Sequence, residues 1–158
     1  MSKLRIAIIG NGGICRGSHI ENYCEDERVE VVAFCDIIEE RAIALRDKYF
    51  PEAAVYTDYK ELLKDESIDA VDICTPNYLH AEIAKAVLAS GKPLNLEKPV
   101  ALNYNEALEI AEAEKASDTF GMTCFSYRFM PAVRYAKRLV DSGKIGNIVG
   151  LNVAYLKC

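Results

Sequence analysis

Residues 10–15 read GNGGIC and directly follow a short apolar run. The spacing is G-x-G-x-x, with Cys15 where a third glycine or alanine is usual. Such glycines let the backbone turn sharply and approach a pyrophosphate, whose charge is held by N–H groups at the start of a following helix. Because a strand pattern precedes this turn and a helix pattern follows it, we predict a dinucleotide-binding loop. The residues expected to form it are Gly10, Gly12, Gly13 and Ile14.

Asp36 ends the next apolar run, at the spacing of about 20 residues that is typical of a ribose-binding carboxylate. Its charge would repel a 2′-phosphate, which favours NAD over NADP. Ile37 and Ile38 offer no cation to that phosphate, although Arg41 lies one helical turn further on. The alternative is that Asp36 caps the helix after it, but the spacing favours the ribose role.

Polar residues also follow three other predicted strands, as Thr75-Pro76-Asn77, Glu97-Lys98-Pro99 and Arg128. In open α/β sheets, ligands bind at the carboxyl ends of the strands. A partly desolvated lysine at position 98 suits proton transfer, with Glu97 orienting it.

Each of these groups also has a structural explanation. Proline and asparagine are common turn residues, and a Glu-Lys pair before a proline is often an exposed ion pair. Arg128 is equally well explained as a surface charge, and His80 is more simply the first residue of a helix than a catalytic base.

Strand and helix patterns alternate along most of the chain. Strands are predicted over residues 4–9, 29–35, 55–57, 70–74, 93–96 and 121–127, and helices over 14–24, 38–49, 59–64, 80–90, 104–117 and 131–142. This alternation predicts an α/β fold, a Rossmann-type doubly wound parallel sheet with right-handed crossovers.

The tail follows a different pattern, because residues 148–156 alternate with Leu151, Val153 and Tyr155 on one face. Alternation predicts an antiparallel strand with one covered face, here the first strand of a truncated second α/β domain. We therefore expect a dinucleotide-binding domain over 1–127 and the start of a substrate domain over 128–158. A bare strand could also pair with a copy of itself, so a homo-oligomer stays an open expectation.

The charge balance restricts the class of partner. Lys and Arg total 19 and Asp and Glu total 24, which gives a net charge of −5. This balance argues against nucleic acid or an anionic membrane, since both require a basic face. No apolar run has the length of a membrane span, and the first strand starts too early to leave room for a signal peptide.

Six cysteines and two histidines are present, with no C-x-x-C pair. Buried free thiols in a cytoplasmic protein are the expected state. No metal site is expected, because the chain has no Cys/His cluster in its sequence.

Taken in order, these segments resemble the glucose–fructose oxidoreductase / inositol dehydrogenase (Gfo/Idh/MocA) family. The matching pieces are residues 10–15 with His19, Asp36, Thr75-Pro76-Asn77 with His80, Glu97-Lys98-Pro99, Tyr127-Arg128-Phe129 with Pro131, and residues 143–146. The Glu-Lys-Pro element is the most specific of them, and the ordered set is more specific than any part.

The resemblance implies a domain that binds NAD or NADP, and hydride transfer at a carbon bearing a sugar or polyol hydroxyl. Lys98 would contact the reacting hydroxyl, with Glu97 near the nicotinamide. Arg128 would lie near the nicotinamide and the substrate. Members sometimes have a cis bond before this proline, so the Lys98–Pro99 bond is a candidate. The residues that would line the cofactor cleft are Thr75, Pro76, Asn77 and His80.

Members of this family are much longer and continue into an α/β domain that supplies an aspartate and a histidine to the active site. We therefore expect an NAD(P)-dependent dehydrogenase present as its cofactor-binding part. The alternatives are a non-enzymatic NAD-binding or redox-sensing module, and a chain that pairs with a separate substrate-domain polypeptide. Lys98 and Arg128 at strand ends favour the enzyme, because a sensor would not need them.

Overall fold

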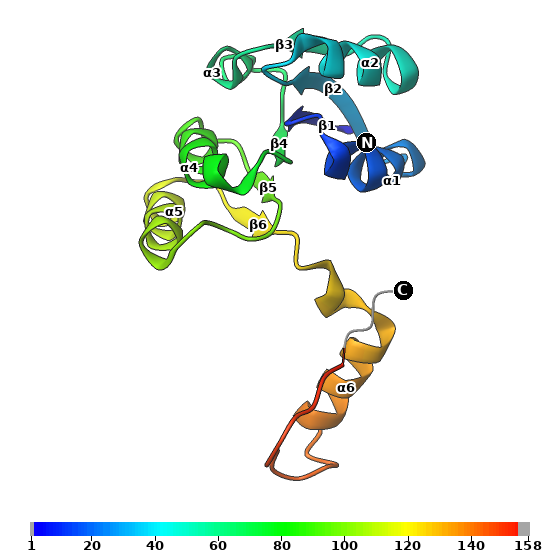
Figure 1. The fold of residues 1–158 in the computed structure, drawn as a ribbon, viewed down its shortest axis with the longest axis vertical. Coiled ribbons are helices and arrows are strands. Elements are labelled where there is room, and N and C mark those ends of the chain that lie inside the picture. Colours follow the sequence, from blue (N-terminus) through cyan, green and yellow to red (C-terminus); the bar gives the residue numbers. More distant parts are fainter. Residues whose placement is uncertain (1, 155–158) are drawn as a thin grey trace. The chain divides into compact units, whose positions relative to one another are not determined.

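The computed structural model describes residues 2–154 (Figure 1). The chain divides into two compact units, Met1–Cys124 and Phe125–Cys158. Across the described residues, no helix has the length and apolar character needed to cross a membrane. The first unit contains the parallel sheet and the predicted loops at its edge, whereas the second contains two helical elements. Whether the second unit opens a further domain stays a prediction.

The first unit is built on a six-stranded sheet in which every pairing is parallel. Its strands are β1 (Leu4–Ile9), β2 (Val29–Cys35), β3 (Ala54–Tyr56), β4 (Ala70–Ile73), β5 (Leu94–Leu96) and β6 (Gly121–Thr123). They lie in the order β3-β2-β1-β4-β5-β6. This order confirms the predicted doubly wound Rossmann sheet, which changes direction between β1 and β4.

Helices cover both faces of this sheet (Figure 1). The helical elements of the first unit are η1 (Cys15–His19), α1 (Ile20–Glu25), α2 (Glu39–Tyr49), α3 (Tyr59–Leu62), η2 (Asn77–Leu79), α4 (His80–Ala89) and α5 (Tyr104–Ala116). Residues of α1 and α2 pack on one face, and residues of α3, α4 and α5 pack on the other. The six predicted helices are therefore present, with ends that differ by one to two residues in most cases.

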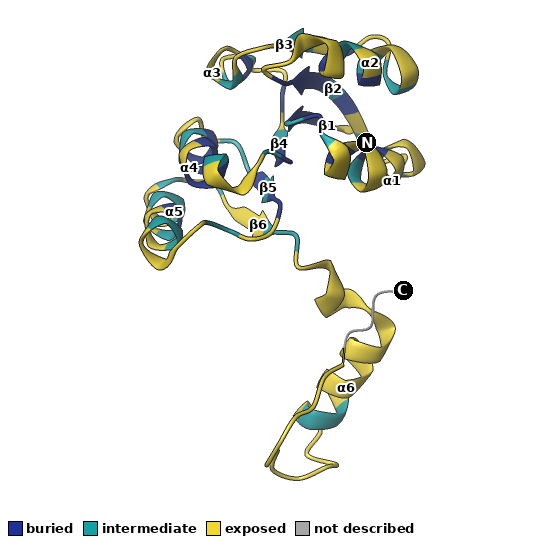
Figure 2. Cartoon of the chain, viewed as in Figure 1, coloured by how far each residue is buried: buried dark blue, intermediate teal, exposed yellow. Residues whose placement is uncertain are grey.

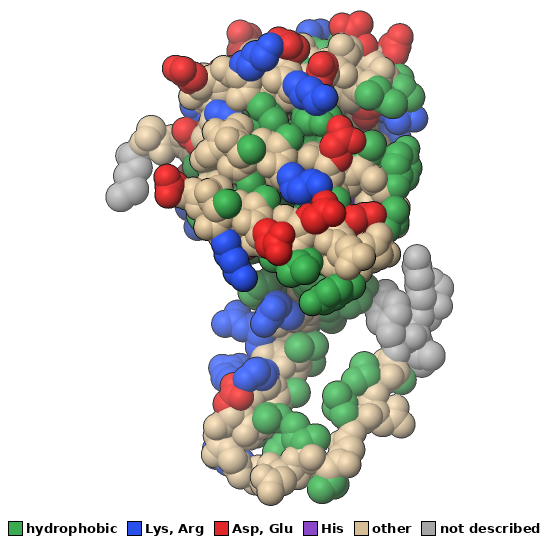
Figure 3. Space-filling model, turned by 90° about the vertical axis from the view of Figure 1, so that its left-hand side faces the viewer, with side chains coloured by type: hydrophobic (Ala, Val, Ile, Leu, Met, Phe, Trp, Pro, Cys, Tyr) green, Lys and Arg blue, Asp and Glu red, His purple; other side chains and the backbone are tan. Residues whose placement is uncertain are grey.

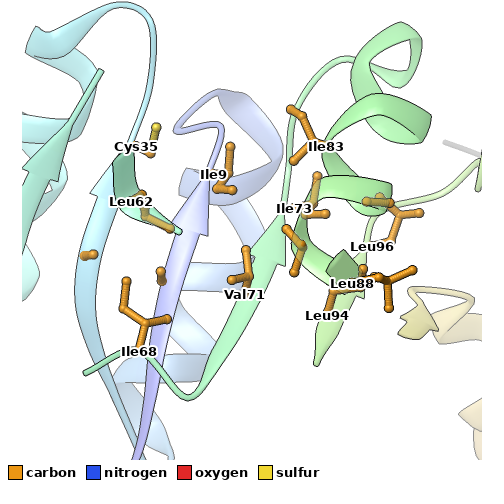
Figure 4. Close-up of a cluster of buried hydrophobic side chains, with 14 of the residues drawn as sticks. Ile9, Cys35, Leu62, Ile68, Val71, Ile73, Ile83, Leu88, Leu94 and Leu96 are labelled. Carbon is orange, nitrogen blue, oxygen red and sulfur yellow. The ribbon is translucent and has the colours of Figure 1, made fainter. Parts of the chain in front are cut away.

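The alternation of side chains along β1 explains the two-sided packing. Ile8 belongs to the same buried cluster as Ile20 of α1, whereas Ile9 belongs to the cluster that includes Ile83 of α4 (Figure 4). Successive side chains of a strand point to opposite faces, so a central strand buried on both sides is apolar throughout. Figure 2 shows this burial concentrated on the central strands.

Opposite charges are interspersed on the face of the first unit shown in Figure 3. Lys85 of α4 also pairs with Glu109 of α5, at 2.5 Å. This arrangement gives that face of the unit no single-sign patch, in keeping with the modest net charge of −5.

The predicted strand over residues 121–127 is wrong in its second half. β6 ends at Thr123, and residues 126–129 form the 3-10 helix η3 (Ser126–Phe129). The physical reason is the length of the neighbouring strand, because the Cys124 N–H donates to the carbonyl of Leu96, where β5 ends. Beyond that bond β5 offers no further ladder partner. The second unit continues with α6 (Pro131–Asp141), which matches the predicted helix.

The predicted strand over residues 148–156 is not formed in its described part. Residues 148–154 have no regular secondary structure, and no described residue forms a ladder with them. A strand requires a paired neighbour for its backbone groups, so alternation alone does not produce one. Tyr155 and Leu156, which belong to the same prediction, lie outside the described residues.

Candidate functional site

The turn after β1 is packed tightly at its first glycine and open at its second. Gly10 has φ of +91°, and a Cβ built on it would lie 2.7 Å from the carbonyl carbon of Cys74 and the nitrogen of Thr75. A side chain at position 10 is therefore excluded by both conformation and contact. A Cβ built on Gly12 would meet nothing within 4 Å. The loop thus presents bare backbone to open space at Gly12.

Asp36 fixes this turn through hydrogen bonds. One carboxylate oxygen accepts the Asn11 N–H at 2.8 Å, and the other accepts the Ile38 N–H at 2.9 Å. The side chain is largely buried, and the guanidinium of Arg41 lies 3.9 Å from its Oδ1. Since Ile38 directly precedes α2, Asp36 also supports the start of that helix, which was the structural alternative for this residue. The two roles are compatible.

The helix that follows the loop begins with an irregular turn. η1 is a π-helical segment that continues into α1, and the Arg16 N–H donates to the Gly12 carbonyl at 3.1 Å. Cys15 is fully buried beneath it. A small side chain at this position permits close packing of helix on sheet. Gly13 and Ile14, in contrast, are exposed at the start of the helix.

Several buried polar atoms at this edge have no partner among residues 2–154. They are the amide nitrogen and oxygen of Asn11 and the hydroxyl of Thr75. Buried polar groups are ordinarily hydrogen-bonded, so atoms of this kind indicate a ligand or bound water. Together with the open space at Gly12, they fit a dinucleotide at the point where the strand order reverses.

The loops after β4 and β5 are joined by a buried histidine. Nδ1 of His80 lies 2.7 Å from the Pro99 carbonyl oxygen, and Nε2 lies 3.0 Å from the Thr75 carbonyl oxygen. Carbonyl oxygens accept hydrogen bonds, so whichever ring nitrogen carries a proton donates to the loop that it faces. His80 is 1% exposed, whereas Pro76 and Asn77 are exposed at the same edge.

The Lys98–Pro99 bond is cis, which confirms the prediction for this bond. Lys98 itself is exposed, and no described residue pairs with its ammonium group. Its backbone N–H donates to Oε2 of Glu97 at 3.0 Å, and Glu97 is 8% exposed. The loop therefore holds a buried carboxylate and presents a free lysine.

His19 bridges two buried carboxylates. Its Nδ1 lies 2.7 Å from Asp72 and its Nε2 lies 3.0 Å from Glu97. The hydrogen bond to Asp72 is the main cause that raises the pKa of His19 to about 9, and Glu97 adds to the effect against the cost of burial. The imidazolium form is thus favoured at neutral pH, and it links η1 to the ends of β4 and β5.

Two members of this network, Asp72 and Asn95, were not predicted from the sequence. Asp72 is fully buried within β4, and its Oδ1 accepts a hydrogen bond from the Asn95 amide of β5 at 2.9 Å. A charged residue inside an otherwise apolar strand was the available signal, because such a residue requires partners when buried. The partners themselves come from distant parts of the chain and leave no local pattern.

The structure brings most of the predicted site residues to one edge of the sheet. The loops after β1, β2, β4 and β5 all lie at the carboxyl ends of parallel strands. Arg128 belongs to η3 in the second unit, so its place beside the others stays a prediction. The cofactor and catalytic roles of the individual residues likewise remain predictions.

Known oxidoreductases resemble this chain in sequence. A family model described as "Oxidoreductase family, NAD-binding Rossmann fold" matches residues 4–124, which is the first unit. Inositol 2-dehydrogenase of Salmonella typhimurium is 36% identical over 145 residues, covering 90% of this chain and 43% of the relative. Levoglucosan dehydrogenase of Pseudarthrobacter phenanthrenivorans is 40% identical over 101 residues, covering 64% of this chain and 26% of the relative.

Solved structures show the same relationship. The crystal structure of myo-inositol 2-dehydrogenase from Lactobacillus plantarum superposes with a TM-score of 0.84 at 31% identity, covering 94% of this chain and 44% of the other. The chain therefore spans less than half the length of these relatives.

Proposed function

The chain belongs to the Gfo/Idh/MocA oxidoreductase family with an NAD-binding Rossmann fold, and from that premise we propose that it is the cofactor-binding part of an NAD-dependent dehydrogenase. The proposed substrate is a sugar or polyol, oxidised at a hydroxyl-bearing carbon. Support comes from the names of the relatives, which are dehydrogenases of inositol and levoglucosan. Both of those molecules carry several ring hydroxyls.

The proposal of NAD as the cofactor, in preference to NADP, rests on the buried carboxylate of Asp36. It is held at the sheet edge by the Asn11 N–H, which leaves lone pairs free to accept from ribose hydroxyls. A 2′-phosphate would meet a negative charge there. Arg41 approaches Asp36 only to 3.9 Å and is itself half-exposed, so it compensates that repulsion weakly.

The remaining site residues have separate proposed roles in holding the cofactor and in the reaction. The pyrophosphate lies along bare backbone at Gly12 and Gly13, and Thr75 and Asn77 line the cleft. Bound NAD would supply the hydride acceptor. Lys98, in its neutral amine form, takes the proton of the reacting hydroxyl at its Nζ and becomes an ammonium; its side chain is exposed and unpaired among the described residues. Glu97 fixes the Lys98 loop through its backbone hydrogen bond.

A calorimetric titration of the purified chain with NAD and with NADP tests this proposal. We expect one NAD site and at least about tenfold weaker binding of NADP, because the 2′-phosphate faces a buried carboxylate. Equal affinities would remove Asp36 from the ribose site. Absence of binding by either dinucleotide would contradict the proposal for this chain as a whole.

A control separates a local effect from a general change of charge. Asp118 is exposed and lies in the loop after α5. Asp118→Ala alters the net charge in the same way as a change at Asp36, so its NAD affinity should equal that of the wild type.

A further inference from the structure

Three side chains that ligate metals in other proteins converge at the edge of the first unit. A ring nitrogen of His19, a carboxylate oxygen of Glu97 and the sulfur of Cys124 all lie within 4.8 Å of one another. They come from η1, the loop after β5 and the residue after β6. We propose that these three residues bind a divalent transition metal ion, with zinc as the preferred ion and one coordination position left open.

The donor chemistry selects the class of metal. One nitrogen, one oxygen and one sulfur suit zinc and its neighbours, whereas magnesium and calcium take oxygen ligands. Zinc lies about 2.0–2.3 Å from such donors, so an ion fits between atoms that are already within 4.8 Å of one another. Three protein ligands leave the fourth tetrahedral position to water or a small anion.

Two of the three ligands are already oriented by outer partners. Nδ1 of His19 is held by Asp72 at 2.7 Å, which leaves Nε2 directed at Glu97. The sulfur of Cys124 donates to Oδ1 of Asn95 at 3.2 Å, and Asn95 in turn donates to Asp72 at 2.9 Å. A carboxylate behind a ligating histidine is the usual second partner in zinc sites.

The charge of the cluster is suited to exchange of protons for a cation. Asp72 and Glu97 are both buried, and His19 is the positive group that bonds to them among residues 2–154. On binding, the ion replaces the Nε2 proton of His19 and the thiol proton of Cys124, and both protons pass to solvent. The cluster loses two positive charges and gains two, so its net charge is unchanged and no electron is transferred.

In a second group, ligand atoms of His19, Asp72 and Cys74 also lie within 4.8 Å of one another. Asp72 is 0% exposed and Cys74 is 4% exposed, so an ion would have to be fully dehydrated to reach them. The group that contains Cys124 is more accessible, since the side chain of Glu97 is 11% exposed and Cys124 is only partly buried. The proposal therefore concerns that group.

This site was not expected from the sequence, which has no clustered Cys and His pattern. The ligands are separated by long stretches of chain and meet only because η1, the loop after β5 and the residue after β6 come together at one edge of the sheet. The proposal does not depend on the dehydrogenase assignment, and its test needs no cofactor.

The experiment is a titration of the reduced, metal-free chain with Co²⁺ and then Zn²⁺. We expect one equivalent of Co²⁺ to bind, with a thiolate-to-cobalt charge-transfer absorption, and Zn²⁺ to displace it. Cys124→Ser should abolish that absorption and weaken Zn²⁺ binding by more than the roughly 10–100-fold that loss of an outer partner causes. His19→Gln should weaken binding to a similar degree, and Asp72→Asn by about 10–100-fold.

The matched control is Cys24→Ser, which removes an exposed thiol of α1. It should leave the absorption and the affinity unchanged. The proposal is overturned if no ion binds, if the absorption persists in Cys124→Ser, or if Cys24→Ser removes it. Circular dichroism checks the fold of each variant. If His19→Gln does not fold, the comparison of Cys124→Ser with Cys24→Ser still tests the proposed site, because each variant changes only one atom of a side chain.

Discussion

The backbone N–H of Asn11 donates to the carboxylate of Asp36 at 2.8 Å, and this bond joins the turn after β1 to the turn after β2. The two turns lie on neighbouring parallel strands, so the bond fixes the glycine loop relative to the sheet edge. Asp36 is therefore both a part of the loop's architecture and the proposed ribose acceptor.

Asp36→Asn separates these two roles. The amide keeps an oxygen that can accept from one backbone N–H, but it loses the charge that repels a 2′-phosphate. We expect weaker NAD binding and a smaller difference between NAD and NADP, measured by calorimetry. Asp36→Ala should in addition lower the free energy of unfolding by about 1–3 kcal/mol, since the buried Asn11 N–H and the partly buried Ile38 N–H lose their acceptor. If Asp36→Asn kept the wild-type preference for NAD over NADP, the proposed ribose role of Asp36 would be contradicted.

Gly10→Ala and Gly12→Ala form a second matched pair. The added methyl at position 10 would press on the backbone of Cys74 and Thr75 in a left-handed conformation, so we expect a loss of stability of at least about 2 kcal/mol. At position 12 the methyl meets open space, so stability should change little while NAD binding is lost. Thermal unfolding and calorimetry measure the two effects. Normal NAD affinity in Gly12→Ala would place the pyrophosphate elsewhere.

The raised pKa of His19 predicts a pH dependence of stability in the metal-free protein. The folded value of about 9 lies above the ordinary value of 6.5, so protonation stabilises the fold. The contribution is complete below pH 6.5 and is lost as the pH rises through about 9. The difference in melting temperature between wild type and His19→Gln should be largest at the acidic end and should narrow toward the alkaline end. A constant difference across this range would show that His19 is not the titrating group.

Lys98→Ala should leave both folding and NAD affinity unchanged, because the side chain is exposed and unpaired within the described part of the chain. In any form of the protein that oxidises a polyol, the same change should lower kcat by at least about 100-fold, the usual contribution of a positioned acid or base. Lys115→Ala, at an exposed position of α5, is the control. Equal kcat values for the two variants would exclude the proposed proton transfer.

Strands buried on both faces could be predicted from the sequence in detail. β1 and β2 begin and end at the expected residues, because their apolar runs stop where the glycine turn and Asp36 begin. β6 and the tail were less predictable, since the length of a strand depends on its neighbour. Residues 125–127 have no ladder partner on β5, because the bond from the Cys124 N–H to the Leu96 carbonyl is the last one.

The sequence was sufficient to predict which loops form the candidate site, but not the side-chain contacts within it. Turn residues after apolar runs mark the positions of Gly10, Asp36, Thr75 and Glu97, and parallel strands bring them to one edge. The contact of His19 with both Asp72 and Glu97 was not predictable, because it depends on how far η1 places its side chain across two strands. Such contacts are set by the packing of the whole unit and not by local spacing.

His80 has a mechanical consequence for the two loops that it joins. Its ring contacts the Thr75 carbonyl on one side and the Pro99 carbonyl on the other, and it is shielded from water. One buried ring therefore connects the loop after β4 to the loop after β5. A displacement of the loop that carries Lys98 would break a His80 contact unless the loop that carries Thr75 moved with it, so we expect the two loops to move together.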